Sequence, residues 1–101
     1  MDLGRMSIKG KENIILREIE GEYILVPISR NFSNTTSIYK LNKTSVYIWD
    51  LIKDNEVKLT KLAHNFSEKF KVDEETALND VNDLLYKLNE YSLIELNNEA
   101  D

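Results

Sequence analysis

The chain has 101 residues, a length that predicts one domain with a single modest core. It contains no cysteine, which excludes disulfides, thiolate metal sites and cysteine nucleophiles. Its net charge of −5 disfavours nucleic acid as a partner, because binding to phosphates requires a basic surface. The apolar runs are too short for a membrane span or a signal peptide. We therefore expect a cytoplasmic protein that contacts neither nucleic acid nor membrane.

The N-terminal part of the chain contains two predicted strands. Residues 1–12 are charged and show no pattern, so we expect a flexible N-terminus. The β-rich runs 14–19 and 23–28 follow, and Gly21 between them is a turn residue, which predicts a hairpin. Pro27 has no N–H to donate and therefore marks a strand end or a sheet edge.

A third strand and the first helix are predicted to meet at one residue. The polar stretch 29–37 is a predicted loop, and the run 38–41 after it is a predicted strand. The Asn42 side chain can accept a hydrogen bond from the amide of Ser45, so a helix over 43–53 is expected to begin there. A single stripe of this helix is formed by the apolar residues Ile48, Trp49 and Ile52 together with the small residue Ser45.

Two further helices are predicted over 60–70 and 73–90. Thr60 is a suitable N-cap for the first and Asp73 for the second, where two following acidic residues suit the helix dipole. The residues 93–96 form a short apolar closing segment. The apolar stripes are Leu62, Ala63, Phe66 and Phe70 in the first of these helices, and Ala77, Val81, Leu84, Leu85 and Leu88 in the second.

Strands followed by helices indicate an α+β fold. We predict a winged-helix-like domain in which a three-stranded antiparallel sheet is followed by three helices that cover one of its faces. The domain is expected to span 13–96, with 97–101 as a flexible tail.

No group of residues has the pattern of a catalytic, metal or cofactor site. His64 is the only histidine in the chain, and this isolation favours a structural role. The acids of the third predicted helix are scattered by helical spacing over a solvent-facing surface. The three glycines lie too far apart for a phosphate-binding loop. We therefore predict a protein that is not an enzyme and uses no cofactor.

The strand predicted at 38–41 is a candidate edge of the sheet, with a row of unpaired N–H and C=O groups. In one interpretation, Lys40 is a charge that protects this edge from aggregation. In the other, the edge accepts an extended peptide as an added strand. Replacing Tyr39 by proline would test the second interpretation, if the Tyr39 N–H points outward.

The ordered combination of these elements resembles the pyrroloquinoline quinone biosynthesis protein D (PqqD) family. Its small winged-helix-like domain is the leader-recognition element of ribosomally made, post-translationally modified peptides. The resemblance covers residues 13–96. In chain order it rests on the hairpin ILREIEGEYILVPI, the succession YKLNKTSVYIWDLI, a helix ending in FKVD, and a last helix with Ala77, Asp80-Val81, Leu84-Leu85 and Leu88 that closes on Leu93-Ile94.

Two loop positions depart from the family pattern. Residues 54–56 stand where the family often has Asp-Gly, and Ser92 stands where a glycine commonly ends the last helix. A positive φ is expected at both positions, which asparagine and serine tolerate less well than glycine.

The resemblance implies a peptide chaperone. A leader peptide would pair antiparallel with the strand 38–41 and insert apolar side chains between that strand and the third helix. The chaperone would then present the precursor to a modifying enzyme, often a radical S-adenosylmethionine (SAM) enzyme. Asp80 could meet a basic leader residue or remain a solvated acid. The implied peptide-binding residues are Ser37, Ile38, Tyr39, Lys40, Leu41, Ala77, Leu78, Asp80, Val81, Leu84 and Leu85.

Two other functions remain open at this point. Three helices with a hairpin can form a winged-helix DNA-binding regulator, although the third predicted helix is more acidic than basic. A structural or interaction domain without a peptide groove is the other alternative.

Overall fold

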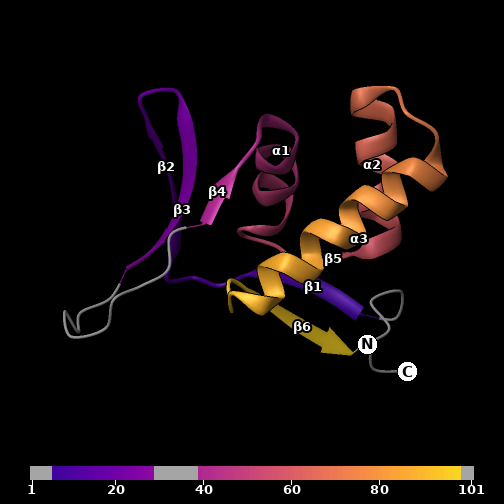
Figure 1. Ribbon diagram of the computed structural model, residues 1–101. Coiled ribbons are helices and arrows are strands. Elements are labelled where there is room, and N and C mark those ends of the chain that lie inside the picture. Colours follow the sequence, from indigo (N-terminus) through magenta and orange to yellow (C-terminus); the bar gives the residue numbers. More distant parts are fainter. Residues whose placement is uncertain (1–5, 29–38, 99–101) are drawn as a thin grey trace.

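The computed structural model describes residues 6–28 and 39–98. The predicted α+β class, with a three-stranded antiparallel sheet and three helices, is confirmed. In chain order the elements are β1 (Met6–Gly10), β2 (Ile14–Ile19), β3 (Glu22–Pro27), β4 (Tyr39–Leu41), α1 (Lys43–Ile52), β5 (Val57–Lys58), α2 (Leu59–Phe70), α3 (Glu74–Glu90) and β6 (Ile94–Asn98) (Figure 1).

The described strands form two sheets. β2, β3 and β4 make the predicted antiparallel sheet in that order, so β2 and β4 are its edges. A second sheet has the order β5-β1-β6, with β1 in the middle and antiparallel to both neighbours. In Figure 1 the first sheet stands beside α1, while β1 and β6 run below α3.

Strand β1 lies in the segment that was expected to be flexible, so that expectation is wrong for residues 6–10. β1 pairs with β6 over its whole length, Ile8 is fully buried, and Gly10 packs against the ring of Trp49. The strands that pair with β1 lie far along the sequence, so the pattern of residues 6–10 alone does not indicate a strand. β6 likewise extends the predicted closing segment into residues expected to form the tail.

Two of the three predicted helix caps are correct. Asn42 Oδ1 accepts a hydrogen bond from Ser45 N (2.8 Å), and Asp73 Oδ1 accepts one from Thr76 N (2.6 Å). The predicted Thr60 cap is wrong, because β5 leads straight into α2. That helix begins at Leu59, and its N-cap residue makes no side-chain cap bond.

Positive φ angles occur at one of the two loop positions where they were expected. Ser92 has φ 60°, whereas none of residues 54–56 has a positive φ. Glu20 (φ 52°) and Gly21 (φ 81°) form the two-residue turn of the β2–β3 hairpin, as the turn type for this loop length requires.

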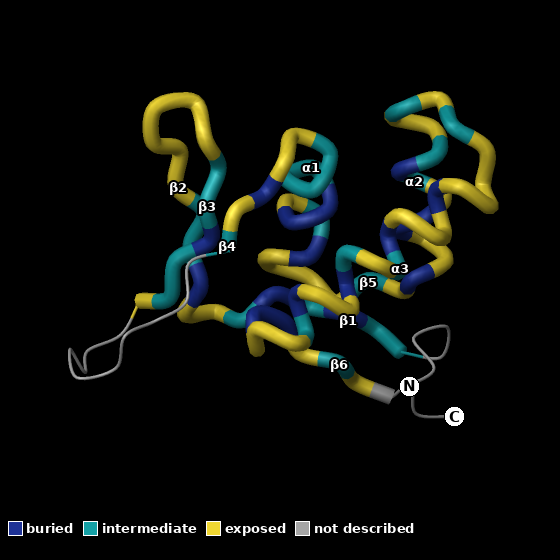
Figure 2. Tube along the Cα trace, in the orientation of Figure 1, coloured by how far each residue is buried: buried dark blue, intermediate teal, exposed yellow. Residues whose placement is uncertain are grey.

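The three helical stripes meet the two sheets in one core (Figure 2). Leu84 and Phe70 are only partly buried, while the other apolar members of the stripes are buried. Trp49 is 1% exposed, in line with its place in the apolar stripe of α1, and its ring lies over Gly10 of β1. No helix in the described residues is long and apolar enough to cross a membrane. The buried residues of the core include Ile8, Leu25, Leu41, Ile48, Ile52, Leu62, Phe66, Ala77, Val81, Leu85, Leu88 and Ile94.

Candidate functional site

The pairing of β3 shows which backbone groups of β4 are free. Along an antiparallel strand, successive residues direct their N–H and C=O groups to alternate sides. Ile28 N donates to Asn13 O (2.6 Å), and Ile19 and Glu22 close the two-residue turn, so the even-numbered residues of β3 bond β2. Its odd-numbered residues therefore bond β4, opposite Tyr39 and Leu41.

Lys40 of β4 consequently directs its backbone N–H and C=O away from β3. It lies opposite Ile24, whose own groups face β2. The open edge of the sheet is thus presented by Lys40, while the N–H of Tyr39 faces β3. The condition for the Tyr39→Pro test is not met, since that change would damage the sheet itself.

A groove of about 350 Å³ lies between β4 and α3. Its lining comes from four elements or their caps, so residues far apart in sequence are brought together. The lining residues are Tyr39, Lys40, Asn42, Thr44, Ser45, Ile48, Phe66, Asp80, Val81, Asp83, Leu84 and Lys87.

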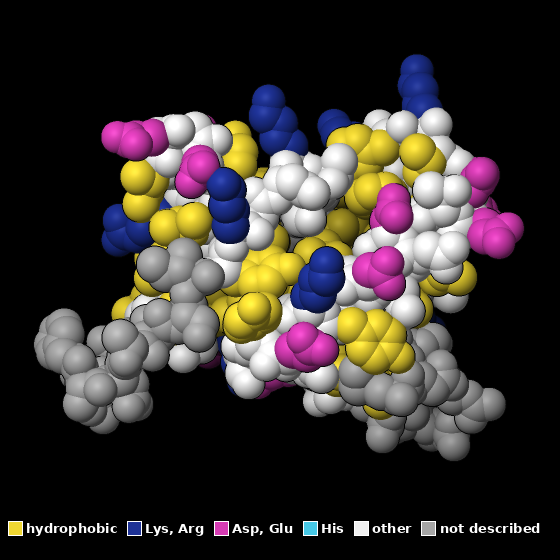
Figure 3. Space-filling model, viewed as in Figure 1, with side chains coloured by type: hydrophobic (Ala, Val, Ile, Leu, Met, Phe, Trp, Pro, Cys, Tyr) yellow, Lys and Arg dark blue, Asp and Glu magenta, His cyan; other side chains and the backbone are white. Residues whose placement is uncertain are grey.

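The floor of the groove is apolar and its rim is charged. Ile48, Phe66 and Val81 are core residues beneath the groove, 0%, 6% and 1% exposed, so the half-buried Tyr39 and Leu84 supply most of the apolar surface that a ligand can reach. Charged side chains of α3 stand around this floor. Figure 3 shows this face hollowed between the first sheet and α3, with hydrophobic side chains in the hollow and both charge signs beside it.

Two tyrosines join β4 to the C-terminal end of α3. The rings of Tyr39 and Tyr91 pack edge to face with their centroids 5.0 Å apart. Burial, followed by the nearby Tyr91 and Glu90, raises the pKa of Tyr39. This contact fixes the start of β4 beside the end of α3.

The structure brings five of the predicted peptide-binding residues into the groove: Tyr39, Lys40, Asp80, Val81 and Leu84. Leu41, Ala77 and Leu85 are buried in the core beneath it. Leu78 is 41% exposed and lines a separate hollow with residues of α2. Ser37 and Ile38 lie outside the described residues.

Seven lining residues were not predicted from the sequence: Asn42, Thr44, Ser45, Ile48, Phe66, Asp83 and Lys87. Asp83 and Lys87 could have been found, because they share a helical face with Asp80 and Leu84 at spacings of three and four. Nothing in the local pattern distinguishes Phe66 from the rest of the core stripe of α2.

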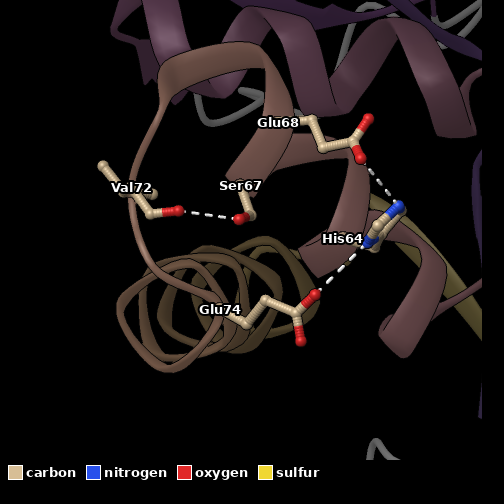
Figure 4. A network of polar contacts seen from close by, with 5 residues as sticks. All are labelled: His64, Ser67, Glu68, Val72 and Glu74. Carbon is tan, nitrogen blue, oxygen red and sulfur yellow. Dashed lines mark hydrogen bonds and ion pairs between the residues drawn. The ribbon is translucent and has the colours of Figure 1, made fainter.

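His64 belongs to a polar network away from the groove (Figure 4). Its ring contacts Glu68 of the same helix (Nε2–Oε1 3.2 Å) and Glu74 at the start of α3 (Nδ1–Oε1 3.4 Å). Nearby, Ser67 Oγ donates to the carbonyl of Val72 (2.7 Å). These contacts join α2 to α3, which gives His64 a structural role. No group of histidine and acidic side chains in the described ranges could hold a metal ion.

Fold and site together define a class: small α+β domains with an open sheet edge beside a helix-lined groove. The chain belongs to the PqqD family, since the family model described as coenzyme PQQ synthesis protein D matches residues 14–94. It is similar to a solved structure titled "TbiB1 in Complex with the TbiA(beta) Leader Peptide", with a TM-score of 0.67 and 20% sequence identity. That match covers 92% of this chain and 99% of the other, and shows a shared fold. None of the curated proteins matches the chain significantly.

Proposed function

We propose that the protein is a peptide chaperone for a ribosomally made precursor peptide. It binds the leader segment as a strand added to β4 and presents the precursor to a modifying enzyme. The observation that carries this proposal is the groove that runs beside the open edge of β4. Membership of the PqqD family supports it, as does the similarity in fold to a protein that was solved with a leader peptide.

Backbone pairing supplies the first part of the interaction. The outward N–H and C=O of Lys40 can bond one residue of an antiparallel peptide. Such bonds are tolerant of sequence, because they involve only the backbone. They explain how a three-residue strand can serve as a docking edge.

The groove floor supplies the second part. Alternate side chains of an added strand point to the same side, so apolar ones can enter the groove against the half-buried Tyr39 and Leu84. The area of contact is small, and we expect a dissociation constant on the order of a micromolar, or about −8 kcal/mol. This strength suits a carrier that must release its peptide.

The modifying chemistry is assigned to a partner enzyme. The proposed partner is a radical SAM enzyme, as the resemblance to the family implies. A short reading frame found beside this gene would be a candidate precursor peptide, and a radical enzyme encoded with it would be the candidate partner.

Proline substitution at Lys40 tests the proposal. Lys40→Pro removes the outward N–H but no bond to β3, whereas Lys40→Ala keeps the N–H and removes only the side chain. The affinity for a fluorescently labelled candidate leader is measured by anisotropy. We expect Lys40→Pro to bind at least tenfold more weakly than Lys40→Ala, about 1.4 kcal/mol, with a similar melting temperature.

The opposite edge of the same sheet offers a matched control. Glu18 of β2 also directs its N–H away from β3, because Glu18 and Tyr23 form a non-hydrogen-bonded pair between the two strands. Glu18→Pro should therefore leave peptide binding unchanged. Equal affinities of Lys40→Pro and Lys40→Ala, or an equal loss with Glu18→Pro, would contradict binding at β4.

The DNA-binding alternative is disfavoured by the charge of α3. Asp80 and Asp83 are exposed on the face that a recognition helix would present to phosphates, against Lys87 alone among the lining residues of α3. A salt-dependent DNA shift assay is expected to show no complex.

A further inference from the structure

We propose that the groove selects peptides by the order of their charges. The preferred peptide carries a basic residue before, and an acidic residue after, the apolar residues that enter the floor. This inference rests on the proposed function and adds the class of leader that the site takes.

Three charged side chains of α3 line the groove and are unpaired within the described parts of the chain. Asp80, Asp83 and Lys87 are all exposed, and none of their side chains has a hydrogen bond or ion pair there. Asp83 and Lys87 stand one helical turn apart, the usual spacing for an ion pair, yet they form none. A charged peptide side chain can therefore pair with them without displacing an existing partner.

The charges are ordered along the helix axis. Asp80 and Asp83 come first and Lys87 follows, about 10 Å beyond Asp80 at the rise of an α-helix. An extended strand covers this distance in three to four residues. One added strand can thus reach both ends of the pattern while its middle residues lie over the apolar floor.

The direction of the peptide follows from the packing of β4 against α3. Tyr39 at the start of β4 contacts Tyr91 just beyond the end of α3, so the two elements run in opposite directions along the groove (Figure 1). A peptide antiparallel to β4 therefore runs in the same direction as α3. Its N-terminal part passes Asp80 and Asp83, and its C-terminal part passes Lys87.

Two neighbouring charges do not reverse this pattern. Lys40 lines the groove, but its ammonium is paired with Glu22 (Nζ–Oε1 2.7 Å), and strand alternation directs its side chain to the sheet face opposite to Tyr39 and Leu41. Glu90 is close enough to raise the pKa of Tyr39 but does not line the groove. The side chains that a bound strand meets are thus acidic first and basic last.

The test begins with selection from a display library of random 12-residue peptides on the full chain. The best binder is synthesised together with a partner peptide in which its acidic and basic residues are exchanged. Both are titrated at low and high salt, and NMR shifts of the chain locate binding. We expect selected sequences to place basic residues before the apolar ones and acidic residues after them. Exchange of the charges should weaken binding about fivefold to tenfold at low salt and less at high salt.

A charge-reversed protein supplies the reciprocal experiment. The double variant Asp80→Lys with Lys87→Glu should prefer the exchanged peptide. The control variant Glu75→Lys with Lys61→Glu makes the same change at exposed positions outside the groove lining and should keep the original preference.

Each outcome of these binding experiments supports or contradicts the proposed charge order. Peptides that shift the groove amides but show no charge order, or the reverse order, would overturn this inference and leave the proposed function standing. Selected peptides that bind elsewhere, or a library without any binder, would count against the proposed function and the inference together.

Discussion

Gly10 packs closely against the ring of Trp49, and adding one methyl group there should destabilise the protein. A Cβ at this position would lie 2.7 Å from Cη2 and 3.0 Å from Cζ3 of Trp49. Carbon atoms in favourable contact are about 3.5–4.0 Å apart, so the ring or β1 would have to move by close to 1 Å. The ring is fully buried and has little room to do so.

The expected cost of Gly10→Ala follows from this overlap. Overpacking of a well-filled core costs about 1–3 kcal/mol, which lowers the melting temperature of a domain of this size by roughly 5–15 °C. The backbone conformation does not add to this cost, because Gly10 has no positive φ. Urea unfolding followed by the fluorescence of Trp49, the only tryptophan, measures the free energy directly.

A double-mutant cycle separates the steric explanation from other causes. Trp49→Phe removes the outer part of the ring, so Gly10→Ala should cost less in that background, and the two changes should not be additive. These unfolding curves are followed by circular dichroism. Wild-type stability of Gly10→Ala, or additive costs in the cycle, would refute the packing of β1 against α1.

Three further predictions concern the core, a cap and the tyrosine contact. Trp49→Ala should cost about 3–5 kcal/mol in urea unfolding. The backbone N–H of Thr76 holds the pKa of the Asp73 carboxyl below its usual range. The cap therefore stabilises the folded protein at pH values above the ordinary pKa, and this contribution is lost as the pH falls through the lowered pKa. Asp73→Asn should weaken this part of the acid dependence of the melting temperature. Burial raises the pKa of the Tyr39 hydroxyl, so its contribution to the stability of the fold is present below the ordinary pKa and is lost as the pH rises through the raised pKa. This pH dependence should be absent in Tyr39→Phe. Absorbance titration of the tyrosines and melting curves at alkaline pH check it.

The local signals in the sequence predicted the first sheet and the helices well. Asn42 and Asp73 have side chains that can bond a free amide only at a helix start, and the apolar spacing identified the buried face of each helix. The second sheet was missed because its partners are distant. The five residues of β1 become a strand only when residues 94–98 lie beside them, and no pattern within 6–10 shows this.

The candidate site was partly predictable for the same reason. The resemblance to the PqqD family placed the site on β4 and α3 and so included Tyr39, Asp80 and Leu84. The apolar spacing of α3 could not tell a groove edge from the core, so Ala77 and Leu85 were included as well. Whether Tyr39 or Lys40 presents the open edge depends on which residues of β3 direct their backbone groups to β2. This could be decided only from the observed pairing of β2 with β3.

Amide hydrogen exchange at Lys40 tests the central claim most directly. In the free protein its N–H faces away from β3, and it should exchange faster than the amides of Tyr39 and Leu41 on either side. A leader peptide bound as an added strand should slow exchange at Lys40 by about tenfold when the free peptide is at ten times its dissociation constant. If the peptide saturates the protein while exchange at Lys40 remains unchanged, strand addition at β4 is wrong.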